Sequence, residues 1–191
     1  MEHVIWSARP YPNFCKLKCL NGVDNEWQIK RGIPVAPRFP KDAYFEMDER
    51  YPKDIALADT LKNLDHMAVI SRRVRDFLAQ KIRKDVEFLK VSIKNHKGRT
   101  EPSEYFVFSP LQIIDCIDKK ASTIQWNKIN PDMMSAVTNM SLVPGAIPDD
   151  LLCFRPRHLE EEVMIRADLA EELRNQKFTG LRFVPISEYG G

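Results

Sequence analysis

Two stretches of the chain share one physical pattern without a gap. Residues 69–93 (VISRRVRDFLAQKIRKDVEFLKVSI) align with residues 164–188 (MIRADLAEELRNQKFTGLRFVPISE). The apolar positions coincide, and each stretch reads strand, helix, strand. Strict identities are few and such short units resemble one another by chance, so the match describes a shared pattern more than common descent. Neither stretch contains a catalytic motif, which predicts that both are scaffold.

The composition is typical of a soluble globular domain. Of the 191 residues, 43% are hydrophobic and 29% are charged, close to the averages for folded domains. A net charge of +2 is far from that of a dedicated nucleic-acid binder, so no nucleic-acid partner is expected. No segment approaches the roughly 20 apolar residues of a membrane span, and no signal-peptide pattern opens the sequence. We therefore expect no membrane association and a cytoplasmic location.

Prolines recur among aromatic residues between positions 32 and 52. The prolines exclude a continuous helix, and the aromatic side chains need a surface that covers them. This composition predicts an ordered, extended, Pro-rich arm. We expect residues 1–52 to form an N-terminal strand and arm segment packed on an α+β core of residues 53–191, the whole being one globular unit.

Two further helices are predicted outside the repeated stretches. Residues 54–65 place Leu57, Leu61 and Leu64 at helical spacing. Residues 109–119 begin with Ser-Pro-Leu-Gln, which combines a serine N-cap, a proline at the first helical position and a glutamine able to complete a capping box. The predicted fold is α+β: a mixed, partly antiparallel sheet flanked by three or four short helices, with two similar strand-helix-strand units.

No set of ionisable residues has a catalytic or metal-binding spacing. The four histidines are scattered, and the four cysteines include only a lone C-x-x-x-C at Cys15 and Cys19. The sequence contains no glycine-rich phosphate loop and no nucleophile-elbow motif. Ser71 is predicted to cap a helix, with the arginines beside it on an exposed face. We therefore expect no catalytic residue, no metal and no cofactor.

Several short segments, taken in order, resemble a known bacterial family. They are residues 54–59 (DIALAD), 69–72 (VISR), 86–89 (VEFL), 105–112 (YFVFSPLQ), 153–156 (CFRP) and 180–185 (GLRFVP). Over residues 34–186 the chain resembles immunity family eleven, the myxobacterial-type immunity domain of polymorphic toxin systems, formerly a domain of unknown function. Residues 180–185 are the most specific piece, whereas family members often have proline where this chain has Lys90.

The resemblance implies a cytoplasmic protein that binds and blocks a cognate toxin, commonly encoded next to it, and it brings no catalytic residues. Because Trp, Tyr and Arg supply most interface hot spots, we select Trp27, Tyr44, Tyr51 and Trp126 as partner-binding residues. Core packing is the competing interpretation for each of the four.

The leading hypothesis is therefore an immunity protein that neutralises a toxin by stoichiometric occlusion, as a monomer or a homodimer. One alternative is an enzyme whose catalytic groups lie on dispersed loops and so form no motif. Another is a homo-oligomeric structural module that uses an exposed sheet edge. The near-neutral charge gives no indication of the toxin's chemistry.

Overall fold

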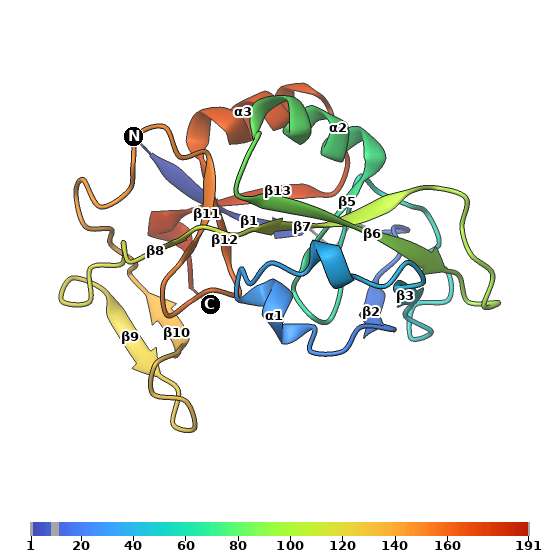
Figure 1. Cartoon of the computed structure of the whole chain (residues 1–191), viewed down its shortest axis with the longest axis horizontal. Coiled ribbons are helices and arrows are strands. Elements are labelled where there is room, and N and C mark those ends of the chain that lie inside the picture. Colours follow the sequence, from blue (N-terminus) through green and yellow to red (C-terminus); the bar gives the residue numbers. More distant parts are fainter. Residues whose placement is uncertain (1, 9–11, 191) are drawn as a thin grey trace.

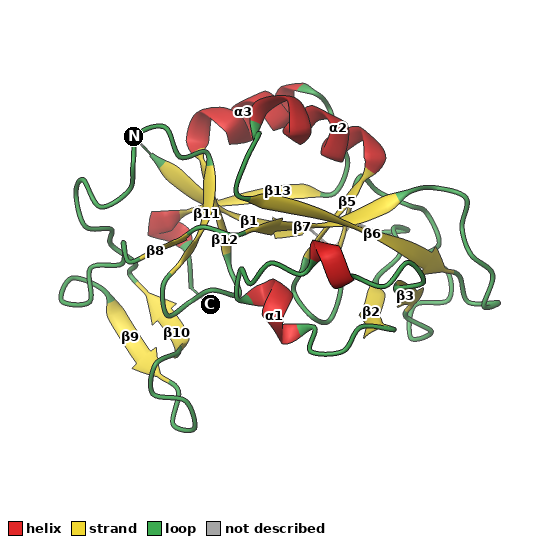
Figure 2. Ribbon diagram, in the orientation of Figure 1, coloured by secondary structure: helices red, strands yellow, loops and turns green. Residues whose placement is uncertain are grey.

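Two sheets, a projecting hairpin and a pair of covering helices make up the fold (Figure 1, Figure 2). The computed structural model describes residues 2–8 and 12–190. The five-stranded sheet has the order β13 (Leu181–Pro185), β1 (His3–Ala8), β12 (Val163–Arg166), β11 (Cys153–Pro156), β8 (Ile113–Ile114). The six-stranded sheet has the order β2 (Leu17–Asn21), β3 (Tyr44–Met47), β6 (Val86–Lys94), β7 (Tyr105–Pro110), β5 (Ala68–Ser71), β4 (Thr60–Leu61).

The remaining elements are short. β9 (Thr123–Trp126) and β10 (Met134–Thr138) form a separate two-stranded hairpin. Within the described residues the helices are α1 (Trp27–Lys30), α2 (Arg72–Lys81) and α3 (Ala167–Asn175), with 3₁₀ turns η1 (Ala36–Arg38) and η2 (Ile186–Glu188). This mixture of antiparallel and parallel pairing with few helices is an α+β fold.

The two similar stretches of sequence fold in the same order of elements. The first forms β5, α2 and β6, and the second forms β12, α3 and β13. β7 lies between β5 and β6 and is antiparallel to both. In the same way, β1 lies between β12 and β13 and is antiparallel to both. The two strands of each unit are therefore parallel to each other, with one strand inserted between them. The strand inserted in the first unit, β7, follows that unit in the chain, whereas the strand inserted in the second unit, β1, precedes it.

One hydrophobic cluster joins the two units. α2 and α3 lie on the same side of the sheets (Figure 1), and their buried residues belong to one cluster. Val74 and Leu78 of α2 meet Leu169 and Leu173 of α3 in this cluster, and each is at most 2% exposed. Burying a side chain of this size stabilises a fold by about 1.5–3 kcal/mol. Because both helices supply the same core, the units form one body.

The edges of the two sheets meet where β4 approaches the residue before β13. Thr60 N donates to Thr179 O at 3.0 Å. The carboxylate of Asp59 accepts from Thr179 N at 2.9 Å, from Thr179 Oγ1 at 3.1 Å and from Ser71 Oγ at 2.8 Å. Ser71 also caps α2 as predicted, since its side chain accepts from Val74 N. Asp59 is only 7% exposed, so these bonds connect three elements where water competes weakly.

Gly180 makes this close approach possible. Its φ is +80°, and a Cβ atom at this position would lie 2.2 Å from Thr60 O. A real Cβ cannot occupy that space, so any other residue forces the two sheet edges apart.

The helix predicted over residues 109–119 is wrong. Ser109 and Pro110 end β7, where they pair with Glu87 and Val86 of β6. The hydroxyl of Ser109 donates to Ile29 O at 3.2 Å, so it is not a helix cap. The local capping pattern is overridden by pairing inside the sheet, and proline is tolerated because it is the last residue of its strand.

The helix predicted over residues 54–65 is also wrong. Ala56 N donates to Asn13 O, and Lys62 O accepts from Leu17 N, at 3.0 and 2.8 Å. Residues far away in the sequence thus form the backbone hydrogen bonds that a helix would make within itself, and residues 54–65 stay non-helical.

The Pro-rich segment 32–52 was expected to lie over the core as an arm, whereas the structure places its strand β3 inside the six-stranded sheet. β3 pairs with β2 on one side and with β6 on the other, and its Phe45 and Met47 are buried. The prolines lie outside the strand, where they cost no sheet hydrogen bond. Both large sheets contain strands from each side of residue 52, and the domain boundary there stays a prediction.

We predict that Gly180→Ala lowers the free energy of unfolding by about 3 kcal/mol or more, because it adds a steric clash to left-handed backbone strain. Gly145→Ala is the matched control: Gly145 has φ +75°, and no atom lies within 4 Å of the place that a Cβ would occupy, so the substitution should cost about 1 kcal/mol. Urea denaturation followed by circular dichroism measures both. Equal losses would show that the contact with Thr60 does not constrain the fold.

Candidate partner-binding surface

The β9–β10 hairpin projects from the body at one end of the molecule (Figure 1). Its tip is ordered by its own polar groups: Asn127 Oδ1 accepts from the backbone N–H groups of Ile129 and Asn130 at 2.8 and 3.0 Å. Asn127 N in turn donates to Met133 O at 2.8 Å. The side chain of Ile129 is nevertheless 96% exposed. An apolar side chain held in water on an ordered loop is available to a partner at small entropic cost.

Trp126 lies at the base of this tip with part of its ring open to solvent. It is 40% exposed, and its ring meets the ring of His158 edge-on at a centroid distance of 5.5 Å. The inner face of the hairpin packs on the body through Ile124 and Val137, which share a cluster with Phe154 of β11. The hairpin is therefore anchored on one face and open on the other.

Residues 158–161 connect the hairpin to α1. His158 O accepts from Met134 N of β10 at 2.8 Å, and Glu161 forms an ion pair with Lys30 of α1 at 3.2 Å. Trp27 is the first residue of α1 and is 48% exposed. Two of the four selected aromatic residues, Trp27 and Trp126, thus lie on elements that flank the same loop.

The other two selected residues lie elsewhere. Tyr44 is in β3, which lies at the opposite end of the molecule from the hairpin (Figure 1), and Tyr51 follows the end of β3 in the sequence. The ammonium group of Lys94 lies 3.2 Å from the centroid of the Tyr44 ring, and that of Lys16 lies 3.5 Å from the Tyr51 ring. The structure does not bring these tyrosines to the tryptophans.

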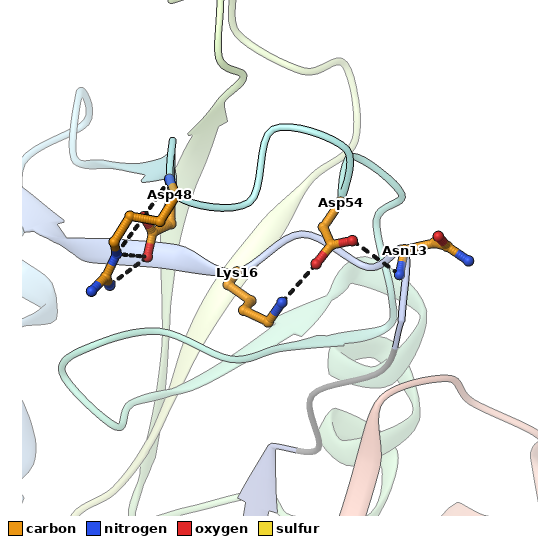
Figure 3. A network of polar contacts seen from close by, with 5 residues as sticks. Asn13, Lys16, Asp48 and Asp54 are labelled. Carbon is orange, nitrogen blue, oxygen red and sulfur yellow. Dashed lines mark hydrogen bonds and ion pairs between the residues drawn. The ribbon is translucent and has the colours of Figure 1, made fainter.

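A polar network lies next to β2 and β3 (Figure 3). Lys16 Nζ contacts Asp54 Oδ2 at 2.6 Å, and Asp54 Oδ1 accepts from Asn13 N at 3.2 Å. The guanidinium of Arg50 donates to both carboxylate oxygens of Asp48. Hydrogen bonds from Arg50 and Lys16 hold the pKa values of Asp48 and Asp54 below their ordinary range. Such carboxylates stay ionised and paired, which suits a structural role and not a general acid.

Three of the four cysteines are core residues, whereas Cys19 is exposed. Cys15, Cys116 and Cys153 are buried, and burial raises the pKa of each thiol to about 12. Thiols in this state are poor nucleophiles. The described residues contain no group of three or more His, Cys, Asp or Glu side chains placed to hold a metal ion. No helix in the described part of the chain is long and apolar enough to cross a membrane.

Two ionisable residues, the buried Arg155 and the partly buried Glu162, form hydrogen bonds within the body. Arg155 is 4% exposed, and its guanidinium donates to Pro110 O at 3.0 Å and Glu160 O at 2.7 Å. Burial lowers its pKa to about 10, so it remains a cation at neutral pH. Glu162 Oε1 accepts from the Tyr189 hydroxyl at 3.2 Å, and burial raises the pKa of this carboxyl.

Comparison with known protein families matches residues 17–188 of the 191 to the Immunity protein family (Imm11). The chain belongs to this family. The resemblance found in the sequence is thereby confirmed, and it extends further toward the N-terminus than the segments that suggested it. No curated protein matches the chain.

In this Imm11 chain, several of the segments that carried the resemblance contain residues that hold different elements of the fold together. Residues 153–156 are β11 and contain Arg155, residues 69–72 contain Ser71, and residues 180–185 begin with Gly180. These segments therefore identify the family through its architecture.

Ile129 is a highly exposed apolar residue that the sequence interpretation did not select. It stands among turn-forming residues, in Asn-Lys-Ile-Asn-Pro-Asp, where an isoleucine has no strand or helix face to occupy. An isolated large apolar residue inside a turn-rich segment is the signal that could have found it.

We predict that Glu162→Gln stabilises the chain at neutral pH and has little effect below the ordinary carboxyl pKa of 4.5. A carboxyl whose pKa is raised by folding contributes most stability when protonated, and that contribution is lost as pH rises from the unfolded toward the folded pKa. Glutamine keeps an oxygen for Tyr189 and carries no charge. Chemical denaturation across this pH range measures the difference.

Glu188→Gln, at an exposed glutamate, is the matched control and should show no such pH-dependent difference. A Glu162→Gln protein less stable than the parent at neutral pH would mean that the ionised carboxylate stabilises the fold.

Proposed function

We propose that this chain neutralises a cognate bacterial toxin by binding it stoichiometrically in the cytoplasm, without turnover. The match of residues 17–188 to an immunity protein family is the observation that carries the proposal. Occlusion requires a preformed surface that buries on the order of 1,600 Å² in total in a complex of standard size. The chain binds as a monomer or a homodimer, and Trp27, Tyr44, Tyr51 and Trp126 stay predicted contact residues.

The chemistry of the side chains supports binding over catalysis. The core thiols have raised pKa values, and Asp48, Asp54 and Arg155 are engaged in structural bonds. A cavity of about 520 Å³ lies between residues 81–85 and 148–153, and its lining includes Lys84, Asp85 and Asp150 but no histidine. Its one thiol, Cys153, is among those whose pKa is raised by burial.

We predict that co-expression of this chain restores growth to cells that produce the toxin domain encoded in the adjacent reading frame. The two proteins should also co-elute in a defined molar ratio, measured by size-exclusion chromatography with light scattering. An unrelated toxin serves as the control and should kill whether or not this chain is present. If the adjacent toxin kills equally well in the presence of the folded chain, the proposal is wrong.

A further inference from the structure

Most strand edges of the two large sheets are covered or very short. The outer edge of β4 meets Thr179, β2 is bridged to Asn63, and β8 has only two residues. The hairpin differs. Met134 and Val137 of β10 are buried against the body, whereas three of the four residues of β9 are exposed. Among the described residues β9 pairs with β10 alone, so its outer edge has no neighbouring strand.

The register shows which backbone groups this edge presents. Met134 N points away from β9, because it donates to His158 O. The cross-strand partner of Met134 is Trp126. In an antiparallel pair, two residues that face each other direct their backbone N–H and C=O groups either both toward the partner strand or both away from it. Trp126 therefore directs its N–H and C=O outward, and so does Ile124 two residues earlier. These four groups are available to an added strand.

The composition of β9 leaves this edge open. Exposed edge strands are usually protected by a charged residue, a proline or a bulge that discourages pairing with another chain. Thr-Ile-Gln-Trp contains no charge and no proline, and the bulge of the hairpin lies in β10. No residue of β9 would therefore block pairing with another chain, and Thr, Ile and Trp are residue types that favour β-strands.

We propose that the outer edge of β9 receives an extended segment of the cognate toxin as an additional strand, with Trp126 and Ile129 as the side-chain anchors. The inference rests on the proposed function and names the surface that performs it. Main-chain bonds to an added strand supply affinity, and pockets for exposed side chains supply specificity. The partly exposed Trp126 and the almost fully exposed Ile129 are the apolar side chains that such pockets would cover.

Charge distinguishes a toxin segment from a second copy of this chain. Lys120 and Lys128 flank β9, both are exposed, and neither forms an ion pair with the described residues. A two-fold antiparallel pairing of β9 with a second copy would bring the Lys128 end of one copy toward the Lys120 end of the other. Like charges brought together in this way repel one another. A toxin strand with carboxylates at its ends complements the same two lysines.

The direct test is residue-resolved amide hydrogen exchange by NMR on the full chain, free and bound to the toxin domain used for the rescue experiment. The amides of Ile124 and Trp126 should exchange rapidly in the free chain and at least about tenfold more slowly in the complex. Binding without protection of these two amides would overturn the inference and leave the proposed function intact. Absence of any binding would overturn both. Protection in the free chain that rises with its concentration would assign the edge to a second copy.

Variants test the anchors and the edge separately. Trp126→Ala and Ile129→Ala should each weaken toxin binding at least about tenfold, measured by calorimetry. Trp126→Pro also removes the outward N–H and should bind at least about threefold more weakly than Trp126→Ala. Ile55→Ala is the matched control, since Ile55 is 62% exposed and lies outside the hairpin. Equal affinities for the alanine and proline variants at Trp126 would argue against strand addition.

Discussion

The carboxylate of Asp59 is the interaction on which the arrangement of the body depends. It receives hydrogen bonds from Ser71, at the start of α2, and from Thr179, just before β13. One buried side chain therefore fixes a helix and two sheet edges together. Leaving such a group without its donors costs about 1–3 kcal/mol or more, so the three elements are held in one relative position. Gly180 allows the approach because it has no side chain at the contact with Thr60.

The parts of the fold that could be predicted from the sequence are those encoded locally. Alternating and helical periodicity gave β5, α2 and β6 and their counterparts near the C-terminus, and Ser71 was identified as a cap from its position before an apolar-periodic segment. The placement of β7 beside β5, and of β1 between the strands of the second unit, could not be predicted. It depends on pairing between segments that are distant in the chain, and hydrophobic periodicity carries no information about which strands become neighbours.

The errors have the same physical origin. Residues 109–119 carry a strong helix-start pattern. The Ser109 hydroxyl nevertheless donates to Ile29 O, and Ser109 and Pro110 pair with β6. Tertiary pairing outweighs a local capping preference worth about 1 kcal/mol. At the candidate surface, aromatic content selected Trp27, Tyr44, Tyr51 and Trp126 together, although the structure does not bring the tyrosines to the tryptophans. Exposure depends on the whole fold, so only an unusual local context, as at Ile129, could indicate a highly exposed apolar residue from the sequence.

The hairpin belongs to neither large sheet, and this separation has a consequence for recognition. The residues that join the body, including Asp59, Arg155 and Gly180, cannot change without loss of stability. Ile129 is almost fully exposed, and substitutions at such positions usually alter stability by less than about 0.5 kcal/mol. The tip can therefore change without loss of the fold. The contacts that hold the body together and the contacts proposed for the toxin are made by different residues.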